Sequence, residues 1–357
     1  MGKTPSRNNT EYWNTKDFKW ISIADLTKAH GYISETKEYI SERAVSESGI
    51  KIIPANTVVM SFKLSIGKTA ITSEDMYSNE AIMAFHDKHV VEILPEYIFY
   101  IFKYKKWDED SNNAVMGKTL NKAILSEVEI EICSIEKQRA IVDILDNMMS
   151  VLESRGTELD LLDNLIKARF VELFYDKGYP VLKWNDVFVT TTGKLDSNAA
   201  VENGEYPFFT CSKKMLKIDH FAFDQEALLL SGNNAAGKYD VKYYKGKFNA
   251  YQRTYILGLK DDWSYQLFRY QLESKLVYLQ QQSLGGLTKY LTMKILEKLE
   301  FVIPPIEKQL EFETFVYQVD KSKLLSFIKL LEQLITYLYN VFIIYRQDKG
   351  EEVERYE

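Results

Sequence analysis

The sequence IEKQRAIVDILDNMMSVLESRGTELDLLDNLIKARFVELFY (Ile135–Tyr175) is the stretch that determines the fold. Alternate steps of four and three residues from Ile141 follow a face that is apolar except at Arg155 and Arg169. This spacing is typical of a coiled-coil helix, which packs against another helix along that face. About forty residues at 1.5 Å each predict a helix roughly 60 Å long, which suits a spacer. The face contains Ile141, Leu145, Met148, Leu152, Arg155, Leu159, Leu162, Ile166, Arg169 and Leu173.

The same pattern returns 171 residues later. Ile135–Gln138 is repeated as Ile306–Gln309, and Ile124–Gln138 matches Ile295–Gln309 at eight of fifteen positions. A motif repeated at a fixed offset indicates two copies of one structural unit. We therefore expect a second long helix, whose apolar face slips by one residue after Val319. This face would contain Phe312, Val316, Val319, Leu324, Phe327, Leu331, Leu334, Leu338, Val341 and Tyr345.

The regions before the two helices repeat as well. Gly67-Lys68 and Asn79 recur as Gly237-Lys238 and Asn249, at an offset of 170. The predicted fold class is α+β: two similar mixed α/β domains joined by two long antiparallel coiled-coil helices in a pseudo-twofold repeat. The predicted parts are a first domain (1–133), a central coiled-coil helix (134–178), a second domain (179–303), a C-terminal coiled-coil helix (304–346) and an acidic tail (347–357).

Within each domain, strands and turns precede a late helix. The first domain is expected to have strands at 51–61 and 68–73, a helix at 95–106, a turn at 117–119 and a strand at 128–132. The second is expected to have a turn at 232–237, a strand pair through Lys247, a helix at 264–281 and a strand at 299–303.

The two copies differ at their start. Gly2-Lys3 aligns with Gly193-Lys194, so Tyr179–Thr192 has no counterpart before the first domain. We expect either a truncated first copy or a permuted arrangement in which the tail Gly350–Glu357 supplies the missing part.

Composition favours a globular protein of a reducing compartment. Apolar residues make up 46% of the 357 residues and aromatic residues 13%. The two cysteines, Cys133 and Cys211, lack the spacing of a metal site or a disulfide framework. No apolar run approaches the roughly 18 residues that span a bilayer. The sequence predicts a cytoplasmic protein that does not enter a membrane.

The net charge is −6, but residues 180–303 alone carry +3. Five basic residues lie between Lys238 and Arg253 against the single acid Asp240, and tyrosines alternate with them. Such a stretch can neutralise phosphates and stack on bases or sugars. It is equally compatible with a solvated hairpin that carries its lysines outside.

The sequence contains few signs of catalysis. Gly232–Lys238 nearly forms a phosphate-binding loop, but Tyr239 replaces the hydroxyl residue that binds magnesium, so a turn between strands is favoured. His86 and His89 have no third ligand nearby, which disfavours a metal site. No nucleophile elbow and no Asn-Pro-Pro-aromatic stretch of an amino-methyltransferase occurs. We infer a binding protein without chemistry of its own.

The sequence resembles the specificity (S) subunits of type I restriction-modification enzymes over almost its whole length. The residues that carry the resemblance are Thr4-Pro5-Ser6, Glu11-Tyr12-Trp13-Asn14, Trp20-Ile21-Ser22, Asp25-Leu26, Ile40-Ser41, Ser65-Ile66-Gly67-Lys68, Asn79 and Ile303-Pro304-Pro305-Ile306-Glu307-Lys308-Gln309.

The resemblance implies two target recognition domains, each recognising half of a bipartite, non-palindromic site in double-stranded DNA. It also implies two methyltransferase (M) subunits, which carry S-adenosylmethionine and modify adenine. Nuclease-translocase (R) subunits would complete the complex, with ATP and magnesium expected in the partners and no cofactor in this chain.

The candidate DNA-binding residues are basic or hydroxyl-bearing and lie near glycine-rich turns, where the backbone approaches a ligand closely. Two equivalent loops, Gly117-Lys118-Thr119 and Gly286-Leu287-Thr288-Lys289, are expected to face DNA, with simple turns as the competing interpretation. The candidates are Ser65, Lys68, Lys118, Thr119, Lys238, Lys242, Lys245, Lys247, Thr288 and Lys289.

Other interpretations remain open. A coiled-coil scaffold or regulator would bind protein rather than DNA, and a nucleotide hydrolase would use Gly232–Lys238. Arg155 and Arg169 either pair with acids of the facing helix and fix its register, or mark where a partner subunit docks.

Overall fold

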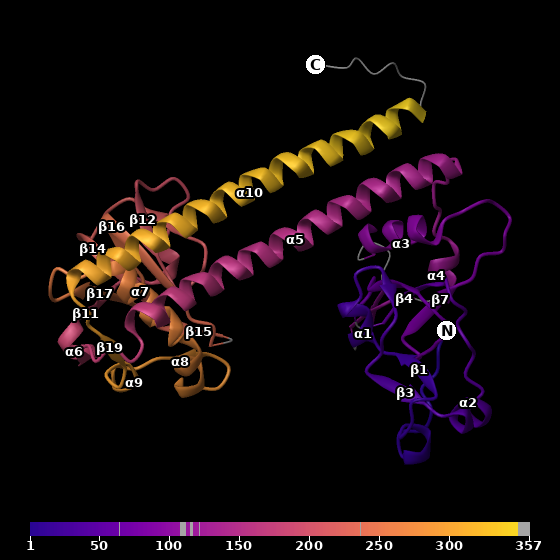
Figure 1. Ribbon diagram of the computed structural model, residues 1–357, viewed down its shortest axis with the longest axis horizontal. Helices are drawn as coiled ribbons and strands as arrows, with labels where there is room; N and C mark the ends of the chain where they lie inside the picture. Colours follow the sequence, from indigo (N-terminus) through magenta and orange to yellow (C-terminus); the bar gives the residue numbers. More distant parts are fainter. Residues whose placement is uncertain (64, 108–111, 115–116, 121, 236, 349–357) are drawn as a thin grey trace. The chain divides into compact units, whose positions relative to one another are not determined.

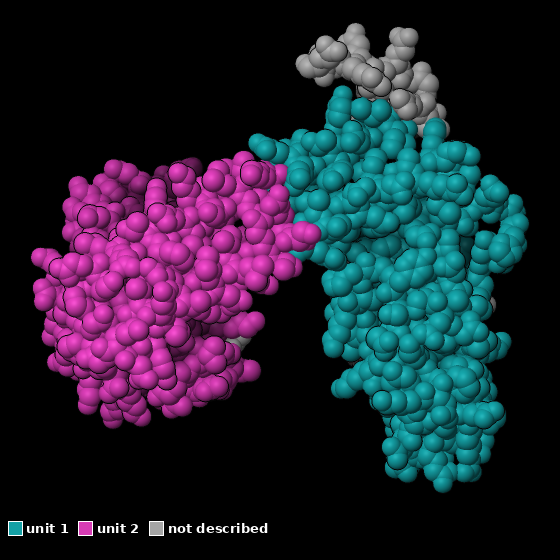
Figure 2. All heavy atoms as spheres, in the orientation of Figure 1, with its two compact units in different colours: residues 1–153, 330–357 teal, residues 154–329 magenta. Residues whose placement is uncertain are grey.

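A computed structural model of the chain describes all residues except 64, 108–111, 115–116, 121, 236 and 349–357. Two compact units are present: residues 1–153 with 330–357, and residues 154–329 (Figure 2). Both divisions fall inside a long helix, so each of these helices belongs partly to each unit. No helix in the described part of the chain has the length and the apolar content that crossing a membrane requires.

The two long helices are α5 (Ile135–Phe174, 40 residues) and α10 (Ile306–Asp348, 43 residues) (Figure 1). Every position of the predicted apolar face of α5 is buried or half-buried. Within the second unit the helices pack antiparallel, since Asp163 of α5 pairs with Lys323 of α10 at 2.6 Å and Arg169 pairs with Glu311 at 2.5 Å. The expected coiled-coil pairing is confirmed there.

The predicted slip on α10 is wrong within the second unit, whereas Leu334 and Val341, further along the predicted face, are half-buried. After Val319 the face that packs on α5 continues in phase through Lys323 and Ser326, whose hydroxyl donates to the Glu158 carboxylate at 2.9 Å. The prediction assumed that apolar residues form the whole interface. In this part, polar residues of α10 face α5 instead and bond to its carboxylates. The assigned residues that are instead exposed are Leu324, Phe327, Leu331 and Leu338.

The arginines on the α5 face form ion pairs. Arg169 bonds to Glu311 across the interface and to Glu172 on its own helix, at 2.5 and 2.7 Å. Arg155 bonds to Glu158 at 2.6 Å. Of the two roles proposed for these arginines, pairing with the facing helix is therefore realised by Arg169.

The second domain is built on a six-stranded sheet of order β11-β17-β14-β16-β12-β13. Successive residues of the central strand β14 point to opposite faces: Leu228 and Leu230 join the core that includes Phe268 of α7, whereas Ala227 and Leu229 join a second core. The elements are β10 (Val181–Lys183), α6 (Trp184–Val187), β11 (Phe188–Thr192), η2 (Ser197–Ala199), β12 (Tyr206–Phe209), β13 (Leu216–Ile218), β14 (Phe223–Ser231), β15 (Asn233–Asn234), β16 (Val241–Ala250), β17 (Thr254–Leu259), α7 (Tyr265–Ser274), α8 (Leu276–Gln282), β18 (Lys289–Tyr290), α9 (Met293–Leu296) and β19 (Glu300–Val302).

In this domain one predicted strand and one predicted strand pair are confirmed, and the predicted helix differs in its continuity. The strand expected at 299–303 is β19, which pairs antiparallel with β10. The strand pair through Lys247 is formed by β14 and β16. The helix expected at 264–281 is interrupted at Lys275 and forms two helices.

The first domain has a four-stranded sheet of order β2-β5-β4-β7 and a three-stranded sheet of order β3-β1-β6. Strands β4 and β5 are buried at every position because apolar clusters cover both faces. The elements are η1 (Thr10–Tyr12), β1 (Phe18–Ile21), α1 (Ile23–Lys28), β2 (Tyr32–Ile33), β3 (Glu38–Ile40), α2 (Glu42–Ser48), β4 (Val58–Ser61), β5 (Thr69–Thr72), β6 (Tyr77–Ser78), β7 (Ile82–Phe85), α3 (Pro95–Tyr104), β8 (Asn112–Ala114), β9 (Gly117–Thr119) and α4 (Lys122–Ser126).

Two predictions for the first domain were wrong. Gly117–Thr119 is not a turn but the strand β9, which pairs with β8 in a hairpin. Residues 128–132 form no strand. Their repeat equivalent β19 gains its ladder hydrogen bonds from β10. None of the described strands pairs with residues 128–132, so this segment has no ladder to join.

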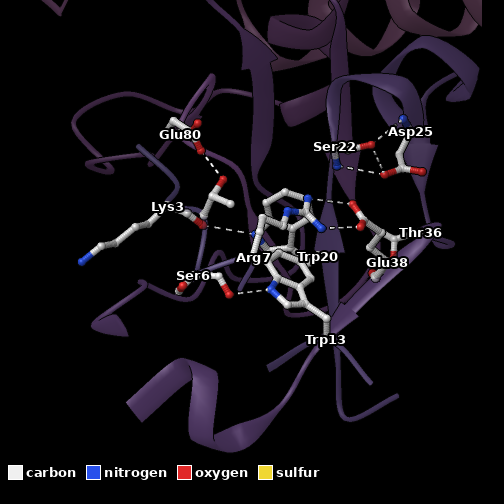
Figure 3. A network of polar contacts seen from close by, with 11 residues as sticks. Lys3, Ser6, Arg7, Trp13, Trp20, Ser22, Asp25, Thr36, Glu38 and Glu80 are labelled. Atoms are coloured by element: carbon white, nitrogen blue, oxygen red, sulfur yellow. Dashed lines mark hydrogen bonds and ion pairs between the residues drawn. The ribbon is translucent and has the colours of Figure 1, made fainter. Parts of the chain in front are cut away.

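The N-terminal segment is fastened to the first domain by aromatic and polar contacts (Figure 3). The indole N–H of buried Trp20 donates to the Lys3 carbonyl at 3.2 Å, and Trp13 packs edge-on against Trp20 at a centroid distance of 4.9 Å. The Arg7 guanidinium lies over Trp13 and also bonds to Glu38 at 3.0 Å. An ion pair, aromatic packing and a buried hydrogen bond thus attach the N-terminal segment to the first domain.

The repeated Ile-Glu-Lys-Gln motif has a structural reason. Gln138 and Gln309 are 0% and 1% exposed. The Gln138 amide oxygen accepts the backbone N–H of Leu94, which precedes α3, and the Gln309 amide oxygen accepts that of Ser264, which precedes α7, at 2.9 and 3.0 Å. Their amide nitrogens donate to carbonyls just before the long helices, at 2.9 and 2.8 Å. Each glutamine therefore ties a long helix to its domain.

We predict that Gln309→Ala lowers the free energy of unfolding by about 1–3 kcal/mol, because it leaves a buried N–H and a buried carbonyl without partners. Urea denaturation followed by circular dichroism measures this change. Gln318→Ala, an exposed glutamine on the same helix, is the matched control and should stay within about 0.5 kcal/mol of the wild type. Equal midpoints for both variants would contradict this role.

Candidate nucleic-acid interface

The two domains carry equivalent connections between adjacent strands. Residues 62–68 join β4 to β5, and residues 232–240 join β14 to β16. Gly67 and Gly237, 170 residues apart, have φ angles of +84° and +65°. A Cβ atom on Gly67 would lie 2.8 Å from a ring carbon of Trp107, so the backbone turn and its close packing both require glycine.

A second segment of each domain lies against this connection. The backbone N–H of Leu120 donates to the Phe62 carbonyl at 2.9 Å, and that of Leu291 donates to the Gly232 carbonyl at 2.8 Å. These pairs are repeat equivalents. In each domain the segment before the leucine, which contains one of the predicted DNA-facing loops, is thereby brought to the strand connection. We call each such combination a loop pair.

The loop pair of the second domain is further joined by strands. Asn233 and Asn234 of β15 pair with Tyr290 and Lys289 of β18. The aliphatic part of Lys289 lies 3.3 Å from where a Cβ atom of Gly237 would be. The sequence predicts both loops but not the contact between them. The shared offset of about 170 residues shows that both segments are duplicated but does not show that they touch.

The predicted residues of the first domain lie on its loop pair. Ser65 and Lys68 are exposed. The Lys68 backbone N–H donates to the buried Ser61 hydroxyl at 3.1 Å, which fixes the end of the connection. Lys118 and Thr119 belong to β9. Their side chains lie outside the described part of the structure.

The second loop pair carries Lys238, Thr288 and Lys289. Lys238 and Thr288 are exposed, and Lys289 is half-buried. The Lys289 ammonium donates to the Gly285 carbonyl at 2.7 Å, so it also closes the loop in which Thr288 lies. These three predicted residues are brought together by the fold.

The lysines of β16 are not brought together in the same way. Successive residues of a strand alternate between its faces. Lys242 therefore lies on the side of Phe248, whereas Lys245 and Lys247 lie on the side of Val241. The single basic stretch of the sequence is thus divided between two faces of the sheet.

Two of these lysines already have carboxylate partners. Lys242 bonds to Asp240 at 2.5 Å, and Lys245 bonds to Glu226 at 2.9 Å. The Glu226 contact raises the pKa of Lys245. Burial and a 2.8 Å hydrogen bond to Glu226 raise the pKa of Tyr243 to about 12. This part of β16 is internally compensated, which matches the hairpin interpretation for these two residues.

The nucleotide-binding alternative lacks the required geometry. A phosphate loop delivers its ligand to the N-terminus of a helix, but Lys238 is followed by strand β16. Tyr239 is only 7% exposed and packs in the core. The interpretation as a connection between strands is confirmed. Among the described residues, no three His, Cys, Asp or Glu side chains come close enough to hold a metal ion.

Comparison with known proteins adds independent information. The family model of the type I restriction modification DNA specificity domain matches residues 1–162 and 177–334. The EcoDI specificity subunit of Escherichia coli is 34% identical over 152 residues, which are 41% of this chain and 33% of that protein. The MjaIX specificity subunit of Methanocaldococcus jannaschii is 28% identical over 233 residues, 58% of this chain and 53% of that protein. The matches thus span between one third and about half of these relatives.

Solved structures share the fold. The S subunit of a type I restriction-modification system from M. genitalium aligns with a TM-score of 0.57 at 12% identity and covers 96% of this chain and 92% of its own. A chain from a structure describing complex assembly and conformational transition of the type I R-M system aligns with a TM-score of 0.53 at 14% identity, covering 93% and 92%. The expected architecture of two mixed α/β domains with two long helices is confirmed.

Proposed function

This chain belongs to the family of type I restriction modification DNA specificity domains, and we propose that it is the sequence-specific DNA-binding specificity subunit of a type I restriction-modification complex. The observation that carries the proposal is the duplicated loop pair. Each domain presents an exposed lysine, Lys68 or Lys238, beside a connection that contains a left-handed glycine. Exposed cations on rigid loops suit contact with a nucleic-acid backbone.

Two similar but non-identical domains favour a bipartite, non-palindromic site in double-stranded DNA. Each domain would bind one half of the site, because the shared framework positions loops whose sequences differ. The long helices would set the gap between the halves. Their continuous hydrogen-bonded backbone and ion-paired interface resist bending and sliding.

The chain itself would perform no catalysis. We propose that two M subunits supply S-adenosylmethionine and methylate adenine, and that R subunits supply ATP- and magnesium-dependent translocation and cleavage. The specificity subunit then selects where its partners act. We propose a cytoplasmic location, where such a complex would reach the genome of its host.

Methylome sequencing of the host, with and without the gene for this chain, tests the proposal. We expect one bipartite adenine-methylated motif to disappear with the gene and to return on complementation. A protein-binding scaffold predicts no motif that depends on the gene. An unchanged methylome in a host whose M subunit is expressed would therefore refute the proposed function.

We predict that Lys68→Ala and Lys238→Ala each reduce the slope of log Kd against log salt by about one, because each removes one phosphate contact. Lys242→Ala and Lys245→Ala should have smaller effects, since Asp240 and Glu226 already bond to these lysines. Titration of the complex with M subunits at several salt concentrations measures the slopes.

The control for this series is Lys260→Ala. Lys260 follows β17 at the end of the sheet remote from residues 232–240 and bonds to the Asn185 carbonyl at 2.6 Å. Its slope should equal that of the wild type. If the slope is unchanged in every lysine variant, these residues do not contact DNA phosphates.

We predict that one heptad inserted into both long helices, after Glu153 and after Lys329, lengthens the gap between the half-sites. Seven residues at 1.5 Å each add about 10.5 Å, or roughly three base pairs of 3.4 Å. Both half-sequences should be retained while the original site is lost, with weaker binding because roughly a third of a helical turn is added. Insertion into one helix alone is the control and should disrupt the pairing. Continued methylation of the original site by the doubly lengthened protein would show that the helices do not set the gap.

A further inference from the structure

The second loop pair ends in an apolar residue that the proposed DNA contacts do not explain. Leu287 is 96% exposed, more than any other large apolar side chain of the described residues. It lies in the loop 285–288, directly before Thr288 and Lys289. Water contacts with a leucine side chain are unfavourable. A ligand that covers this side chain removes its apolar surface from water, which favours binding.

The loop holds Leu287 outward. Leu284 and Tyr290 exchange two backbone hydrogen bonds, of 3.0 and 2.9 Å, at the base of the loop. Gly285 has a φ angle of +99°, and a Cβ atom there would lie 2.2 Å from the Thr288 carbonyl oxygen. The Lys289 ammonium closes the loop by its bond to Gly285. Leu287 is therefore presented on a closed turn that only glycine permits at position 285.

The surroundings of Leu287 indicate what covers it. Lys289 follows it by two residues, and the β15–β18 pairing brings the connection that carries exposed Lys238 to the same place. The centre of a protein–protein interface is depleted of such charges. A DNA duplex, in contrast, offers apolar base faces bordered on both sides by phosphates. Proteins that deform DNA insert single apolar side chains, leucine among them, between neighbouring base pairs.

We propose that Leu287 is a wedge that enters a base step of the half-site bound by the second domain, with Lys238 and Lys289 on the flanking phosphates. This proposal rests on the proposed function. Insertion unstacks two neighbouring base pairs, and the apolar contact with the exposed base faces offsets part of the loss of stacking. The half-site would then be selected partly by how easily its sequence deforms.

The sequence of the first domain also places an apolar residue two positions before a lysine in the equivalent loop. The repeat offset of 171 places Met116 opposite Leu287 and Lys118 opposite Lys289. Methionine is another of the apolar residues used as wedges. Met116 lies outside the described residues, so the proposal concerns Leu287 alone.

The test uses the full chain in complex with its M subunits and the site obtained from the methylome. Duplexes carry 2-aminopurine in place of one adenine at a time, excluding the methylated adenines, because a methyltransferase displaces those itself. In the wild-type complex we expect increased fluorescence at one base step of one half-site. Leu287→Ala should abolish that increase and weaken binding about tenfold, whereas Leu287→Phe should retain the increase.

The matched control is Val277→Ala, which removes a 67% exposed apolar side chain of α8 in the same domain. It should change neither fluorescence nor affinity. An increase that persists in Leu287→Ala, or no increase in the wild-type complex while it binds its site, would overturn the wedge and leave the proposed function intact. Loss of M subunits from the purified Leu287→Ala complex would identify a protein contact instead. A wild-type complex without sequence-specific binding would refute the proposed function itself.

Discussion

Two buried glutamines fix the orientation of each domain against its long helix. A glutamine amide offers an acceptor and two donors in a fixed plane, so it can satisfy backbone groups from two segments at once. Gln138 and Gln309 use this capacity in the same way. Each amide oxygen accepts the backbone N–H of the residue that precedes a domain helix, and each amide nitrogen donates to a carbonyl just before its long helix. Since both groups are buried, any other orientation of helix and domain would leave polar atoms unpaired. The positions of the loop pairs depend on this constraint.

The fold was largely predictable because its main signals are local and repeated. The heptad spacing of α5 and the Ile-Glu-Lys-Gln repeat both survive in the structure. Prediction failed where a partner elsewhere in the chain decides the outcome. The face of α10 passes through Lys323 and Ser326 because carboxylates of α5 lie opposite them and bond to them. The spacing of apolar residues cannot predict such polar partners. Residues 128–132 resemble β19 in sequence, yet a strand exists only where a second strand supplies its ladder.

The candidate site was predictable by residue type but less so by arrangement. Lys238 and Lys289 were both proposed from sequence, and the fold joins their loops. The lysines of β16 were treated as one patch, although the alternation of a strand already separates Lys242 from Lys245 and Lys247. That separation was available from the sequence once a strand was expected there. The pairing of Lys245 with Glu226 was not, because it requires the register of β14 against β16.

The two units are divided within α5 and α10 rather than in a loop, and every hydrophobic cluster of the described residues belongs to one unit or the other. Genetic exchange between two such chains has few places where it preserves packing. Two crossovers in phase with the heptad, one in the sequence that codes for α5 and one in that for α10, would transfer residues 154–329, a complete domain with the half of each helix on which it rests. No core has to be rebuilt after such an event. Exchange between two such chains can therefore combine whole domains of different origin without disturbing a hydrophobic core.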